Sequence, residues 1–160
     1  MKYGRLYSVV FENVAVTVAS DMFMIVPATN KPIVLHACYL SQSTEIGDAQ
    51  EEYLRIKIIA GLATVGSGGT APTPNPLNPA DAAAGATARV NDTTPAVIGA
   101  GSTLIIWAES FNERSGWVWL PTPEMRPVIT AAQTRVVVTM LSTPADSVTM
   151  NGTLIFEEIG

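Results

Sequence analysis

The two β-rich stretches at the end of the chain constrain its fold more than any other feature of the sequence. Residues 134–142 read TRVVVTMLS and residues 147–159 read SVTMNGTLIFEEI, with Thr-Pro-Ala-Asp between them at 143–146. β-Branched and aromatic residues favour strands, whereas proline and aspartate favour turns. The pattern therefore predicts two neighbouring strands that are joined by a short turn.

The rest of the chain repeats this pattern in shorter runs. Apolar and polar residues alternate in residues 5–12 and 53–60, as in strands with one buried face. Val14, Val16 and Val18 continue the first run after Asn13, which is expected to form a bulge or bend. Further strands are predicted at residues 22–26, 33–42, 86–91, 103–109 and 116–120.

These strands predict an all-β chain of about eight or nine short strands. Only one helical turn is indicated, within residues 43–52, where Asp48 and Glu51 have the spacing of a helix N-cap box. A chain of 160 residues with 48% apolar residues can build one domain with a sizeable core. We expect a single domain over residues 1–160, folded as a jelly-roll-like β-sandwich.

Composition excludes several classes of function. Charged residues make up 14% of the chain, and the net charge is −5, which disfavours binding to a nucleic acid backbone. A surface so poor in charge is often covered in part by other chains. No run is long enough to span a membrane, the N-terminus lacks a signal-peptide core, and one cysteine allows no internal disulfide. We expect a soluble protein that is made in a cytoplasm.

Residues 61–85 form a long segment without a strand pattern. The segment contains a Gly-Ser-Gly-Gly run and four prolines, Pro72, Pro74, Pro76 and Pro79. Such a loop is either a mobile surface loop or a functional one, and closely spaced prolines stiffen a chain toward an extended form. On the second interpretation the segment is an arm, and deletion of residues 71–79 should leave the sandwich folded but abolish binding to neighbouring subunits.

The sequence contains no convincing catalytic or metal-binding constellation. His36 is the one histidine, and the alternating pattern places it on the same strand face as Cys38. Two ligands do not make a zinc site, so a partly buried core histidine is the better interpretation. Glu109 and Glu113 flank a turn near tryptophans, but solvated acids are favoured over a glycosidase pair. No enzyme activity, cofactor or metal is expected.

A second predicted contact region follows residue 116. Trp117 and Trp119 share a strand face, which fits core packing best, with a subunit interface or a platform for sugar rings as alternatives. The segment 121–127, PTPEMRP, is too rich in proline for a central strand, and a rigid segment loses little entropy on docking. The predicted interface residues are Pro72, Pro74, Pro76, Leu77, Pro79, Trp117, Trp119, Pro121, Pro123, Glu124, Met125, Arg126 and Pro127.

A family resemblance adds a setting to this description. The segments that carry it are GDAQEE (47–52), GSGGTAPTP (66–74), DAAAGAT (81–87), PTPEMRP (121–127) and PADSVTMNGTLIFEEIG (144–160). They resemble those of small all-β proteins from tailed-phage and prophage genomes.

The resemblance implies a virion structural protein, made in the host bacterial cytoplasm and located on the capsid surface. It implies a capsid decoration or cement protein, expected as a homotrimer that binds the major capsid protein. The alternatives are a receptor- or glycan-binding module of a phage fibre, a tail structural subunit and, last, a virion glycosidase.

Overall fold

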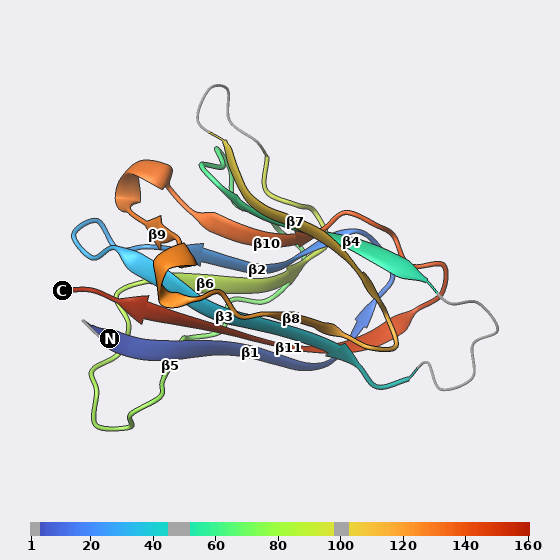
Figure 1. Ribbon diagram of the computed structural model, residues 1–160, viewed down its shortest axis with the longest axis horizontal. Coiled ribbons are helices and arrows are strands. Elements are labelled where there is room, and N and C mark those ends of the chain that lie inside the picture. The colour runs from blue at the N-terminus through green and yellow to red at the C-terminus, as the bar shows by residue number, and fades with distance from the viewer. Residues whose placement is uncertain (1–3, 45–51, 98–102) are drawn as a thin grey trace.

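The computed structural model describes residues 4–44, 52–97 and 103–160. The chain folds into two antiparallel sheets that pack face to face, so the prediction of an all-β sandwich is confirmed (Figure 1). The strands are β1 (Arg5–Val16), β2 (Ser20–Val26), β3 (Ile33–Gln42), β4 (Tyr53–Ala60), β5 (Asn75–Pro76), β6 (Thr87–Asp92), β7 (Leu104–Asn112), β8 (Trp117–Trp119), β9 (Val128–Ile129), β10 (Val136–Met140) and β11 (Val148–Glu158).

The chain passes from one sheet to the other at most of its connections. The first sheet has the order β5-β1-β11-β3-β8, with β9 also paired to β3, and the second has the order β6-β2-β10-β4-β7. Two short 3-10 helices, η1 (Pro123–Met125) and η2 (Ala131–Gln133), lie on either side of β9. Most of the helical turn predicted in residues 43–52 lies outside the described residues.

The prediction that the last two strands pair with each other is wrong. β10 pairs with β2 and β4 in the second sheet, whereas β11 pairs with β1 and β3 in the first. The turn between them carries the chain across the sandwich, whose sheets are separated by about 10 Å. All five residues of β10 are buried, so this strand needs a neighbour on both edges and cover on both faces.

Alternating side chains from both sheets fill the core. Tyr7 stacks on Phe156 with ring centroids 5.6 Å apart, and Phe11 contacts Phe23 at 5.2 Å. A smaller apolar cluster lies on the other face of the second sheet, where Val26 and Ala96 pack against it. Its buried members are Met24, Ile59, Leu62 and Val137. Loop residues therefore give the second sheet a second buried face.

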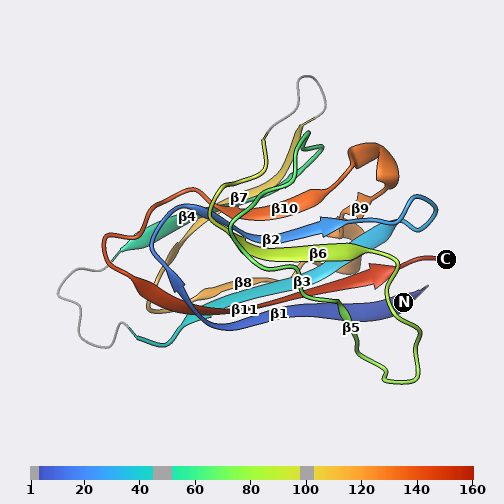
Figure 2. The same cartoon turned by 180° about the vertical axis from the view of Figure 1, so that it is seen from behind.

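Residues 61–85, here called the strap, lie along one side of the sandwich. Thr70 bridges to Val90 of β6, and Ser67 bridges to Thr94 just after β6. β5 then pairs with β1 (Figure 2). The accessible surface is 7811 Å², close to the roughly 7,700 Å² expected for a compact monomer of this mass. The strap is thus an extended segment that packs against its own domain along most of its length, whereas the loop after β5 extends beyond the sheets (Figure 2).

Candidate functional site

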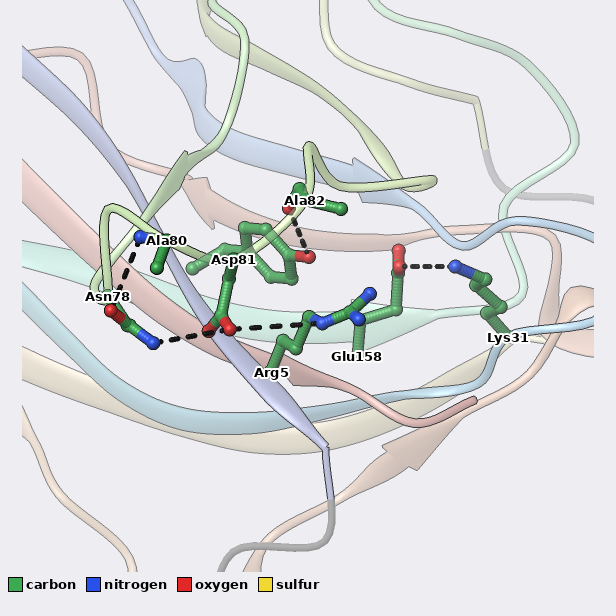
Figure 3. A network of polar contacts seen from close by, with 8 residues as sticks. Arg5, Lys31, Asn78, Ala80, Asp81, Ala82 and Glu158 are labelled. Carbon is green, nitrogen blue, oxygen red and sulfur yellow. Dashed lines mark hydrogen bonds and ion pairs between the residues drawn. The ribbon is translucent and has the colours of Figure 1, made fainter.

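Side-chain contacts fasten the second half of the strap to the body (Figure 3). The Tyr7 hydroxyl donates to the Ala82 carbonyl at 2.9 Å, and Arg5 lies 3.9 Å from Asp81. The buried carboxylate of Glu158 accepts from the backbone N–H of Gly85 at 3.1 Å and from Lys31 Nζ at 3.3 Å. These contacts tie the strap to both β1 and β11.

Some of the predicted interface residues of the strap are therefore buried against the body, and others are exposed to solvent. Pro74 is buried, and Pro72 and Pro76 are half-buried because they lie against the edge strands. Leu77, which is 50% exposed, and Pro79 remain accessible at the tip.

The interface prediction for Trp117 and Trp119 is corrected. Both indoles are 3% exposed and belong to the core, and Trp119 contacts Trp107 edge-to-face at a centroid distance of 6.3 Å. Neither residue can stack on a sugar or dock on a partner from this position. The core-packing alternative therefore holds, and the exposed residue of the same strand is Val118, at 64%.

Glu109 lies near the tryptophans because its side chain is hydrogen-bonded to two of them. Its Oε2 atom accepts from Nε1 of Trp107 and from Nε1 of Trp117, both at 3.0 Å. These two hydrogen bonds lower the pKa of the Glu109 carboxyl group. A carboxylate held in its charged form by two donors suits the role of an acceptor better than that of a general acid.

The outer face of the first sheet carries an uncharged row of side chains. The strand register places Val10 beside Thr153, Thr153 beside Tyr39, and Tyr39 beside Val118. The row faces away from the core, and Val10, Tyr39 and Val118 are 39%, 37% and 64% exposed. We call Val10, Thr153, Tyr39 and Val118 the outer row.

Charge is also scarce around the outer row. On β11, β3 and β8, which are described in full, the outward-facing residues include no lysine or arginine, and His36 and Glu157 are bonded to each other. On β1, Glu12 adds one exposed carboxylate. Beyond β8, Leu120, Met125 and Val128 are exposed by 64%, 56% and 55%. Exposed apolar surface that spans several strands marks a site of protein interaction.

A groove lies on the same face of the first sheet, between segment 121–127 and the strands β3 and β11. Its volume is about 440 Å³, and Val34 and Val128 form part of its apolar wall. Of the predicted interface residues, Pro123, Glu124 and Arg126 line this groove. Pro121 is buried, Pro127 is half-buried, and Met125 is exposed.

His36 lies in this groove because of a bulge in β3. The register of β3 against β11 shifts between Leu35 and Ala37, so one extra residue separates the two halves of the strand. Cys38 consequently points into the core, where burial raises the pKa of its thiol, and His36 points outward. The prediction that His36 and Cys38 share a face is wrong, because that alternation assumed an unbroken ladder.

The described ranges contain no cluster of three or more His, Cys, Asp and Glu side chains that could hold a metal ion. They also contain no helix with the length and hydrophobicity needed to cross a bilayer. No protein-family model, curated protein or solved structure matches the chain.

Proposed function

We propose that the protein is a non-enzymatic structural subunit of a phage particle, a capsid decoration or cement protein that binds the assembled head. The outer row and the exposed residues beside it carry the proposal, because they offer an apolar part of a sheet face with few charges to a protein partner. The resemblance to phage and prophage proteins gives the setting. The partners proposed are the major capsid protein and sister subunits in a homotrimer.

The mechanism of such a protein is thermodynamic linkage. A subunit that binds the assembled shell, and not its disassembled state, shifts the equilibrium toward the intact shell. A stiff body serves this purpose because little conformational entropy is lost when it docks. The sandwich and the fastened strap provide such a body.

We also infer that the sandwich is a jelly roll. Leaving aside β5, β6 and β9, the first strand neighbours the last, the second the next to last, and so on inward: β1 with β11, β2 with β10, β3 with β8, and β4 with β7. An antiparallel ribbon rolled into two sheets gives this order, and jelly rolls are common in viral capsid domains. An experimental strand order that breaks any of these pairs would contradict the inference.

Cosedimentation with heads that lack the protein tests the proposed function. Val118→Glu places a charge in the outer row at a position that is 64% exposed, so it should leave folding intact. We expect this variant to bind at least about tenfold more weakly than the wild type, a loss of about 1.4 kcal/mol. Val65→Glu, on the strap and 51% exposed, is the matched control and should bind normally.

The proposed function is wrong if the wild-type chain does not sediment with heads. The assignment of the outer row is wrong if Val118→Glu binds as tightly as Val65→Glu. Light scattering over a range of protein concentrations tests the oligomer, and a concentration-independent trimer is expected. Rings or tubes would instead indicate a tail subunit.

A further inference from the structure

The strand β1 has an outer edge that is only partly covered. β5 pairs with β1 at Tyr7 and Ser8 alone, and in residues 4–44, 52–97 and 103–160 no strand pairs with this edge between Val9 and Val16. An uncovered strand edge presents unpaired backbone N–H and C=O groups to a neighbouring chain.

The pairing of β5 with β1 shows which residues of β1 direct their backbone N–H and C=O groups toward the open edge. The backbone N–H of Leu77 donates to the carbonyl of Leu6 at 2.9 Å, which shows that the outward-facing residues of β1 direct their backbone groups toward this edge. Ala15 also faces outward, because Val14 and Val16 on either side pack toward the core. The N–H and C=O of Ala15 therefore point to the open edge.

A pocket of about 230 Å³ lies beside this part of the edge. Residues 14–17 form one wall, and Gly68, Gly69 and Asn91 belong to the opposite wall. The Oδ1 atom of Asn91 is buried without a hydrogen-bond partner, and the residue is only 9% exposed. A buried acceptor without a donor is costly, and a donor brought by a bound segment would satisfy it.

Two glycines let the strap lie close against β6 on the far side of this pocket. A Cβ atom on Gly69 would lie 2.0 Å from the Val90 carbonyl oxygen, and Gly68 has a φ of 91°. Larger residues at these positions would push the strap away from β6. Because Gly68 and Gly69 have no side chains, backbone atoms form this part of the wall opposite β1, which suits the close approach of another extended chain.

We propose that the slot between residues 14–17 of β1 and residues 68–70 of the strap binds an extended segment of the major capsid protein by strand addition. The segment would pair with the backbone of Ala15 and donate an N–H group to Asn91. Small side chains are expected, since glycine, alanine and threonine line much of the slot. The inference deepens the proposed function and rests on it, because the neighbour is a subunit of the head.

Ala15→Pro tests the slot. Proline removes the N–H that points to the open edge and leaves the ladder with β11 intact, as is tolerated on edge strands. Val65→Glu, on the strap outside the slot and 51% exposed, is the control. With heads that lack the protein as the probe, Ala15→Pro should lose at least about tenfold in affinity, whereas Val65→Glu should bind like the wild type.

Hydrogen exchange on the wild-type chain gives a second measurement that needs no variant. The Ala15 amide should exchange more slowly in the head-bound protein than in the free protein. The slot is ruled out if the wild type binds heads and Ala15→Pro binds equally well, or, should that variant fail to fold, if the Ala15 amide gains no protection. If the wild type does not bind at all, it is the proposed function that fails, and this inference fails with it.

Discussion

His36 and Glu157 face each other across β3 and β11 on the outer surface of the first sheet, with Nε2 of His36 2.8 Å from Oε2 of Glu157. The other carboxylate oxygen of Glu157 accepts the backbone N–H of Gly4. Burial lowers the pKa of His36, the hydrogen bond to Glu157 raises it in part, and the charge of Arg126 lowers it further. The neutral imidazole is therefore favoured in the folded protein.

This arrangement predicts a stability that depends on pH through His36. Because its folded-state pKa lies below the usual 6.5, the unfolded chain takes up a proton first as the pH falls, and stability is lost below that value. The free energy of unfolding should drop more for the wild type than for His36→Gln between pH 7.5 and 5.5. Urea denaturation at the two pH values measures this, and equal drops would show that His36 does not titrate in this way.

Asp21 should have a pH dependence of the opposite sign. Burial raises its pKa above 3.8, although the N–H of Ala96 and the side chain of Thr139 donate to it. The folded state then holds the proton more tightly, so stability falls as the pH rises from 3.8 through the folded-state pKa. Asp21→Asn should remove this loss and raise the melting temperature at pH 7. Asp146→Asn, at an exposed position, is the control and should have little effect.

Glu109 should stabilise the side of the sandwich where β7 meets β8. Glu109→Ala leaves the indole N–H groups of Trp107 and Trp117 without their acceptor, a loss of about 0.5–1.5 kcal/mol because the site is partly open to water. Glu109→Gln keeps a carbonyl oxygen and should lose less. Denaturation followed by tryptophan fluorescence reports both stability and the indole environment. Glu124→Ala removes an exposed carboxylate, and a Glu109→Ala variant no less stable than this control would refute the assignment.

Local patterns were sufficient to locate most strands. The predicted bounds 33–42 and 53–60 agree with β3 and β4, and Leu54, Ile56 and Ile58 are buried as alternation requires. Asn13, with a φ of 54°, lies at a register shift in β1, so the predicted bulge is confirmed. Strand bounds, alternating burial and the bulge at Asn13 depend on residues that are close together in the sequence, so local patterns are enough to predict them.

Features that depend on pairing between distant strands could not be predicted in this way. The bulge at His36 is defined by the register of β3 against β11, which lies more than a hundred residues further along the chain. The outer row arises only when four strands align, and each of its members looks like the outward residue of an ordinary strand. A turn containing proline can connect strands of two different sheets as well as the two strands of a hairpin. The turn residues before β11 therefore do not show which strand it pairs with.

Deletion of residues 71–79 should now have a different outcome from the one that the sequence suggested. The deletion removes β5 and shortens the strap, so the hydrogen bonds of Tyr7 and Glu158 with the rest of the strap should be strained or lost. Loss of about 3 kcal/mol from these hydrogen bonds should lower the melting temperature by roughly 6–12 °C. It should also uncover the whole outer edge of β1, a long strand that would then pair with other chains.

The uncovered edge can be separated from the loss of stability. Sizing chromatography with light scattering should show concentration-dependent association of the deletion variant. Leu77→Ser combined with Pro79→Ser changes exposed residues of the strap and keeps β5, so this control should retain both the melting temperature and the oligomeric state of the wild type. If the deletion variant matches this control in both measurements, the strap neither protects β1 nor contributes to the stability of the sandwich, and an independent mobile arm becomes the better description of residues 61–85.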